Sequence, residues 1–196
     1  MLSYFKPQVQ EATDPVARML LRARLRPNQL TILGLGVSCG AAVAFAAGWL
    51  RLGAALLTVA GLFDLFDGSL ARLTRQETEF GAFLDSVVDR YSDLVVLLGI
   101  LLAYQLAADL AGSLATMATL VGTVMVSYTK ARAQSIGFSC DIGLMERPER
   151  LIGLVVGATF HVLTPAMIVL AVLTNLTALQ RIFWTRRAAQ DPARRP

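Results

Sequence analysis

DLFDGSLAR at residues 64–72 and GAFLDSVVD at residues 81–89 are the most informative stretches of this sequence. Each stretch places two carboxylates in a largely apolar segment. Asp64 and Asp67 are three residues apart and therefore share one face of a helix. Asp85 and Asp89 are four residues apart and do the same on the next helix. Because the pairs lie at matching distances from the segment between them, an antiparallel hairpin brings all four carboxylates to one level, about 15 Å from its turn at about 1.5 Å per residue.

The composition indicates a membrane protein. Of the 196 residues, 55% are hydrophobic and 16% are charged, whereas about 25% of residues are charged in a soluble domain. The same figures exclude intrinsic disorder. The two cysteines, Cys39 and Cys140, lie far apart and exclude a disulfide scaffold. An integral membrane protein is the class that remains.

Uncharged runs predict where the chain crosses the bilayer, because a span needs about 20 mostly apolar residues. Such runs cover residues 27–50, 110–129 and 151–180, and Pro165, which suits the first turn of a helix, divides the third. The section between them is apolar but interrupted by carboxylates. We predict an all-α integral membrane protein with six transmembrane helices, at residues 28–49, 51–74, 79–104, 109–136, 148–162 and 165–186.

The segment before the first span predicts an N-terminal interfacial amphipathic helix. Asp14 and Pro15 are typical of a helix start. Arg18, Arg22 and Arg26 fall on one side of that helix, where they can reach anionic headgroups. An ordinary exposed arm is the alternative. We expect a single membrane domain over residues 1–196, made of an interfacial segment (1–26), a six-helix bundle (27–187) and a polar tail (188–196).

Lys and Arg are distributed unequally between the two sides of the predicted bundle. They gather in the N-terminal segment, in the turn after the second helix, around the loop after the fourth and in the tail, whereas Arg51 stands alone on the other side. The positive-inside rule therefore places both termini and the active site in the cytoplasm, in a multi-pass protein of the cell membrane. The net charge of +4 follows this topology, and we expect no nucleic-acid partner.

Four carboxylates at one depth repel one another unless cations neutralise them. Oxygen ligands suit Mg²⁺ or Mn²⁺, and four Asp on two helices can hold two ions, an arrangement used in phosphoryl chemistry. Pairing of the carboxylates with Arg72, Arg75 or Arg90 is the alternative. The regular spacing favours a metal site, whose ligands are Asp64, Asp67, Asp85 and Asp89.

The two opening stretches resemble the signature of the CDP-alcohol phosphotransferase family, D-x2-D-G-x2-A-R-x8-G-x3-D-x3-D, at all eight fixed positions. The resemblance implies a six-helix enzyme that takes CDP-diacylglycerol and an alcohol, forms a phosphodiester and releases CMP. It implies that Asp89, besides binding metal, is the general base on the acceptor hydroxyl. It also implies that the nucleotide is bound by Gly68, Ala71 and Arg72, with Asn28 and Thr31 of the PNQLT segment as weaker candidates.

A second group of basic residues bears on the acceptor. The stretches SYTKARA (127–133) and ERPER (146–150), with Gln180 and Arg181, resemble those of phosphatidylinositol phosphate synthases, a branch of this family whose acceptor is inositol 1-phosphate. The resemblance implies that the acceptor phosphate is bound by Ser127, Lys130, Arg132, Arg150 and Arg181. The alternative is that these cations only set the membrane topology.

Two other functions stay open on the sequence. Glycerol 3-phosphate also carries a phosphate, so a phosphatidylglycerol phosphate synthase is the second candidate. A membrane cation transporter is the candidate from a different class, because intramembrane carboxylates also serve transport. The family resemblance further implies a homodimer among membrane lipids, and Gly99 and Gly122 could allow close helix packing.

Overall fold

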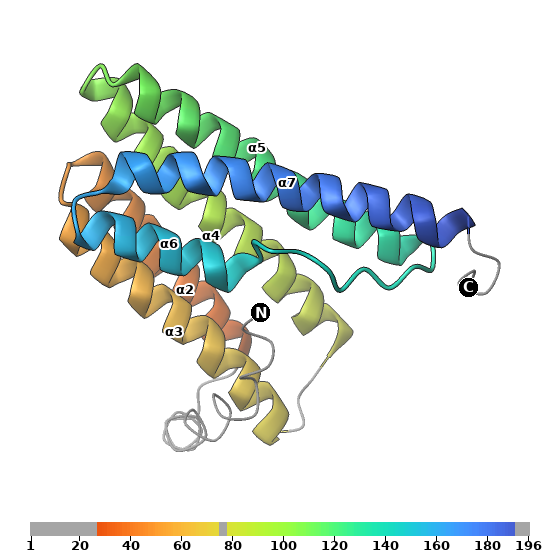
Figure 1. Cartoon of the computed structure of the whole chain (residues 1–196). Helices are drawn as coiled ribbons and strands as arrows, with labels where there is room; N and C mark the ends of the chain where they lie inside the picture. Colours follow the sequence, from red (N-terminus) through yellow and green to blue (C-terminus); the bar gives the residue numbers. More distant parts are fainter. Residues whose placement is uncertain (1–26, 75–77, 191–196) are drawn as a thin grey trace. The chain divides into compact units, whose positions relative to one another are not determined.

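The computed structural model describes residues 27–74 and 78–190. The predicted interfacial helix therefore lies outside the described residues. Those residues form helices and no strand (Figure 1). The helices are α2 (Pro27–Ala46), α3 (Leu50–Thr74), α4 (Glu79–Leu106), α5 (Leu110–Ser135), α6 (Arg147–Thr159) and α7 (Leu163–Gln190). The prediction of six helices is confirmed, and Pro165 lies in the first turn of α7 as expected.

The chain is a multi-pass membrane protein. Among the described residues, four segments are long and apolar enough to span a bilayer: Pro27–Ala46, Leu50–Leu73, Leu110–Ser135 and Leu163–Gln190. Helix α4 has 28 residues, but its first half carries the carboxylates. Helix α6 has 13 residues and extends about 20 Å at about 1.5 Å per residue, less than the hydrocarbon thickness of about 30 Å.

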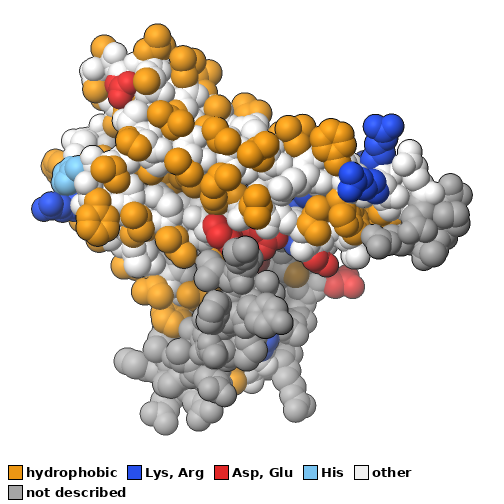
Figure 2. Space-filling model, viewed as in Figure 1, with side chains coloured by type: hydrophobic (Ala, Val, Ile, Leu, Met, Phe, Trp, Pro, Cys, Tyr) orange, Lys and Arg blue, Asp and Glu red, His pale blue; other side chains and the backbone are white. Residues whose placement is uncertain are grey.

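Helix α5 shows how the apolar surface is arranged. Its exposed apolar residues recur every three or four positions and form one stripe: Leu114, Met117, Val121 and Val124. Its buried face carries small polar residues: Ser113, Thr116, Thr119 and Thr123. Figure 2 shows hydrophobic side chains spread over the visible surface of α5 and α7, with Lys and Arg gathered toward the C-terminal end of α7. Small residues inside and apolar residues outside are typical of helices that pack within lipid.

Four helices end in the same hydrogen-bonded turn. After α2, the N–H of Gly48 donates to the carbonyl of Phe45 and that of Trp49 to the carbonyl of Ala44, both at 2.9 Å. This is a Schellman motif, which needs a left-handed residue just beyond the helix. That residue has a φ of 78° at Gly48, 53° at Ala108, 89° at Gly137 and 59° at His161. The motif explains why α2 ends at Ala46, before the predicted end at residue 49.

The chain divides into two compact units, Met1–Ala103 and Tyr104–Pro196. In the first unit α2 packs along α3, and α4 approaches α2 so closely that a Cβ on Gly99 would overlap the backbone of Ala42. In the second unit α7 packs against α5 and α6, and a Cβ on Gly122 would overlap Thr174. Both glycines are thus used in packing within the chain.

Candidate active site

Three of the four predicted metal ligands lie together. One oxygen from each of Asp64, Asp67 and Asp85 lies within 4.8 Å of the others. Asp67 is buried, and the other two are half-buried. Two oxygens that share one Mg²⁺ at about 2.1 Å each are at most about 4.2 Å apart, so these three are near the separation that a shared ion needs. The residues present therefore fit a divalent cation with carboxylate ligands.

Asp89, the fourth predicted ligand, is not part of this group. It lies one helical turn beyond Asp85 on α4, and its Oδ2 is 3.8 Å from Nη1 of Arg90. The helical spacing thus put Asp89 on the expected face, while its side chain lies beside a neighbouring guanidinium.

A cavity of about 400 Å³ opens beside the carboxylates. Its walls come from α2, α3 and the start of α4, all within the first unit. Asp67 and Asp85 of the metal group line it. So do all the residues predicted to bind the nucleotide: Asn28, Thr31, Gly68, Ala71 and Arg72. The volume lies in the usual range for a small-molecule pocket, about 300–1,000 Å³.

Thr78, directly before α4, also lines the cavity and was not predicted from the sequence. The Thr78 hydroxyl accepts a hydrogen bond from the N–H of Gly81 at 2.9 Å and so caps the helix. A Cβ on Gly81 would lie 2.9 Å from that hydroxyl and 3.4 Å from Oδ1 of Asn28. The signal for Thr78 was available, because a threonine directly before an acidic residue often starts a helix.

Two polar side chains of the cavity have partners within the first unit. Arg72 is exposed, and its Nη2 donates to the Ser69 hydroxyl at 3.1 Å. Thr31 donates its hydroxyl proton to Oδ2 of Asp67 at 2.7 Å. A residue predicted to bind the nucleotide is thus in direct contact with a predicted metal ligand.

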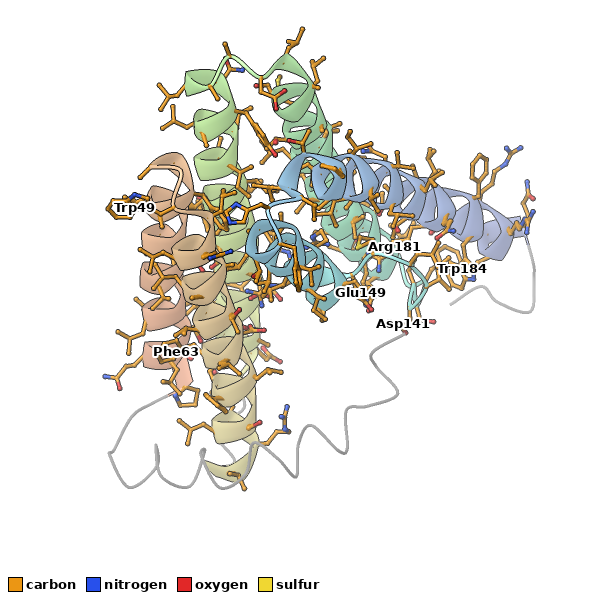
Figure 3. The ribbon with its side chains drawn as sticks, turned by 60° about the vertical axis from the view of Figure 1, so that its left-hand side comes forward. Trp49, Phe63, Asp141, Glu149, Arg181 and Trp184 are labelled. Carbon is orange, nitrogen blue, oxygen red and sulfur yellow. The ribbon has the colours of Figure 1, made fainter. Side chains whose placement is uncertain are left out.

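The residues predicted to bind the acceptor phosphate belong to the second unit, where Arg181 is the most buried of them. Its side chain is 2% exposed and extends from α7 to the connection between α5 and α6 (Figure 3). Nε donates to the carbonyl of Ile142 at 2.7 Å and Nη1 to that of Val126 at 2.6 Å. Nη2 donates to Oε1 of Glu146 at 3.0 Å. Arg181 therefore fastens the connection at residues 136–146 to α7.

Lys130 reaches the same carboxylate. Its Nζ lies 3.8 Å from Oε1 of Glu146 and 3.3 Å from Oδ1 of Asp141. Nη1 of Arg150, which is buried, donates to the carbonyl of Met145 at 3.4 Å. We call Lys130, Arg150 and Arg181, with Glu146 and Asp141, the cationic cluster. No sequence pattern predicted a role for its two acidic members, Glu146 and Asp141.

The other two predicted acceptor residues lie on α5. Arg132 is exposed, and its Nη1 donates to the Ser135 hydroxyl at 3.2 Å. Ser127 is half-buried and precedes Lys130 by one turn. Thr177 of α7, which was not predicted, accepts the N–H of Met145 with its hydroxyl at 3.1 Å and so holds the same connection.

A model of the CDP-alcohol phosphatidyltransferase family matches residues 24–186. The archaetidylinositol phosphate synthase of Methanothermobacter thermautotrophicus is 38% identical over 190 residues, which cover 94% of this chain and 93% of that protein. The phosphatidylinositol phosphate synthase of Mycobacterium marinum is 40% identical over 192 residues, which cover 91% of this chain and 82% of that protein.

Solved structures agree with these sequence matches. The Mycobacterium tuberculosis phosphatidylinositol phosphate synthase PgsA1 with CDP-DAG bound has a TM-score of 0.82 and 38% identity, covering 88% of this chain and 92% of that one. The same enzyme in complex with manganese and citrate has a TM-score of 0.81, covering 89% and 88%. Signature, fold and relatives all point to an enzyme and away from a cation transporter: this chain belongs to the CDP-alcohol phosphatidyltransferase family.

Proposed function

We propose that this chain transfers the phosphatidyl group of CDP-diacylglycerol to inositol 1-phosphate and releases CMP. The observation that carries the proposal is the cavity of about 400 Å³, where two carboxylates of the metal group and every residue predicted for the nucleotide meet. The names of the relatives, archaetidylinositol and phosphatidylinositol phosphate synthase, support this acceptor.

The carboxylates would hold the cofactor. Asp64, Asp67 and Asp85, joined by Asp89, would bind Mg²⁺ or Mn²⁺, and two ions suit four carboxylates. When bound, the ions neutralise the pyrophosphate of the donor. Arg72, exposed at the cavity, would add charge-assisted hydrogen bonds to the same phosphates. Gly68 and Ala71 have small side chains on the α3 side of the cavity, so that a nucleotide can approach the helix backbone there.

Asp89 would be the general base. Its carboxylate would accept the proton of the acceptor hydroxyl as the hydroxyl oxygen attacks the β-phosphorus. The new oxygen–phosphorus bond forms while the bond from the β-phosphorus to the bridging oxygen breaks, and CMP leaves with that electron pair. The position of Asp89, one turn beyond Asp85 on the same face, supports this role.

The acceptor phosphate would bind in the cationic cluster, with Ser127 and Arg132 as the other predicted contacts. Lys130 and Arg181 already converge on one carboxylate oxygen of Glu146. Cations that gather around one anionic group can hold a phosphate in the same way.

The placement of the protein in the cell belongs to the same proposal. We propose a single membrane domain in the cell membrane, with both termini and the active site facing the cytoplasm, that works as a homodimer among membrane lipids. The distribution of Lys and Arg supports the orientation. The helical part of the predicted bundle extends to Gln190, slightly beyond the predicted end at residue 187.

An acceptor comparison tests the proposal. Purified protein receives CDP-diacylglycerol and Mn²⁺ with, in separate reactions, inositol 1-phosphate, inositol, glycerol 3-phosphate or serine, and CMP and the lipid product are measured. We expect the highest turnover with inositol 1-phosphate and none in the Asp67→Asn variant. A preference for glycerol 3-phosphate would instead identify a phosphatidylglycerol phosphate synthase, and no CMP with any acceptor would overturn the proposal.

A further inference from the structure

Among the three grouped carboxylates, Asp67 has a hydrogen-bond partner on another helix. It is 5% exposed, and its Oδ2 accepts a hydrogen bond from the Thr31 hydroxyl at 2.7 Å, between α3 and α2. Thr31 itself is 8% exposed. The carbonyl of Pro27 is also near this hydroxyl, at 3.2 Å. Since the hydroxyl has one proton, the shorter and charge-assisted contact with the carboxylate is the stronger of the two.

Helix packing holds the two partners at this distance. One turn after Thr31, a Cβ on Gly34 would lie 3.3 Å from the Cβ of Phe63 and 3.8 Å from the carbonyl oxygen of Ala60. The backbone of α2 therefore approaches α3 closely at this height, and Thr31 is carried to Asp67. The hydrogen bond joins residues that are 36 positions apart in the sequence.

A bond of this kind orients a metal ligand. The hydroxyl occupies one side of Oδ2, which restricts rotation of the Asp67 carboxylate and directs its remaining lone pairs. Partners that orient ligands in this way change metal affinity by about 10- to 100-fold when they are removed.

We infer that Thr31 is a positioning residue for Asp67 and thereby sets the affinity of the site for its divalent cation. The inference rests on the proposed function, in which the carboxylates hold Mg²⁺ or Mn²⁺. It gives Thr31 a role that differs from nucleotide contact, because its hydroxyl proton is donated to the carboxylate.

Direct Mn²⁺ binding tests the inference without any substrate. The purified protein is titrated with Mn²⁺, and the free ion is followed by its electron paramagnetic resonance signal. Thr31→Val keeps the size of the side chain but removes the hydroxyl, and we expect its dissociation constant for Mn²⁺ to rise at least about tenfold. Thr31→Ser keeps the hydroxyl and should bind within about threefold of the parent protein.

Thr58→Val is the matched control. Thr58 lies on α3, and its hydroxyl donates to the carbonyl of Ala54 in the same helix at 2.9 Å. Its loss should leave Mn²⁺ binding unchanged. If Thr31→Val does not fold, judged by its melting temperature, Thr31→Ala provides the same deletion with less bulk. Mn²⁺ affinity equal to that of the parent protein in a folded Thr31→Val or Thr31→Ala variant would overturn the inference.

Kinetics separate positioning from nucleotide contact. If Thr31 acts through Asp67, excess Mn²⁺ should restore the turnover of Thr31→Val, with the KM for CDP-diacylglycerol unchanged. A raised donor KM at saturating Mn²⁺, with normal Mn²⁺ affinity, would show a nucleotide contact instead. Failure of the proposed function looks different: the parent protein would bind Mn²⁺ but release no CMP. A parent protein that binds no Mn²⁺ would overturn the inference.

Discussion

The carboxylate cavity of the first unit groups charges of one sign, whereas the cationic cluster of the second unit pairs charges of opposite sign. In the cavity, helices α3 and α4 bring like charges together, with oxygens of Asp64, Asp67 and Asp85 within 4.8 Å. In the cationic cluster, each cation named above has an acceptor within the chain: Glu146 for Lys130 and Arg181, and a backbone carbonyl for Arg150.

The two regions are therefore stabilised in different ways. Grouped carboxylates need a cation from solution, because like charges at this separation repel. In the cationic cluster two carboxylates offset two of the three positive charges, so its members also hold the fold together. We therefore expect metal removal to abolish activity at the cavity, and the loss of a charged partner to destabilise the fold around the cationic cluster.

The largest effect should come from removing metal. With excess chelator, turnover of CDP-diacylglycerol should fall below detection and return when Mg²⁺ or Mn²⁺ is restored, because the grouped carboxylates need a neutralising cation. CMP release is the measurement, and the melting temperature of the metal-free protein is the control for folding. Full turnover with metal verified as absent would show that the grouped carboxylates need no cation for activity.

Replacing Asp89, the proposed general base, should have the second-largest effect on turnover. Asp89→Asn keeps the volume of the side chain but cannot accept the hydroxyl proton, so turnover should fall at least about 100-fold. Asp93→Asn, one turn further along α4, is the matched control and should keep most of the activity. Single-turnover CMP release measures the chemical step. Equal losses in the two variants would point to a general disturbance of α4.

Removing Arg181, the buried partner of Glu146, should mainly lower the stability of the fold. Arg181→Leu removes one donor from each of two backbone carbonyls and from the Glu146 carboxylate, and we expect the free energy of unfolding to fall by about 3 kcal/mol, the lower end for a buried ion pair. The melting temperature should fall by about 10 °C. Arg187→Leu, exposed on the same helix, is the control. An unchanged melting temperature in Arg181→Leu would mean that this arginine serves the acceptor alone.

The smallest effect should be a selective loss of acceptor binding. Lys130 is one-third exposed, and its ion pairs with Asp141 and Glu146 are open to solvent, so their loss should cost little stability and Lys130→Ala should fold normally. Losing one charge-assisted contact to the acceptor phosphate should raise the acceptor KM about tenfold, with the donor KM unchanged. Arg187→Ala serves as the control for charge alone. A raised donor KM with a normal acceptor KM would assign Lys130 to CDP-diacylglycerol.

Regular spacing along helices made much of the cavity predictable. Asp64 and Asp67 share a face of α3, an uncharged run predicted α2, and the spacing of Asp85 and Asp89 placed both on one face of α4. The nucleotide candidates Asn28 and Gly68 then line one cavity. The cationic cluster was only half predictable, because Glu146 and Asp141 lie in or beside an irregular connection whose path no periodicity reveals.

Apolar runs and helical periodicity were enough to predict the all-helical membrane fold, the helix ranges to within about four residues, and the face on which each carboxylate lies. These follow from local chemistry: apolar runs partition into lipid, and a helix turns by a constant angle per residue. The hydrogen bond from Thr31 to Asp67 and the anchoring of the 136–146 connection to α7 by Arg181 came instead from contacts between distant segments. Such pairings depend on how closely helices and loops approach one another, which is set by packing between residues far apart in the sequence.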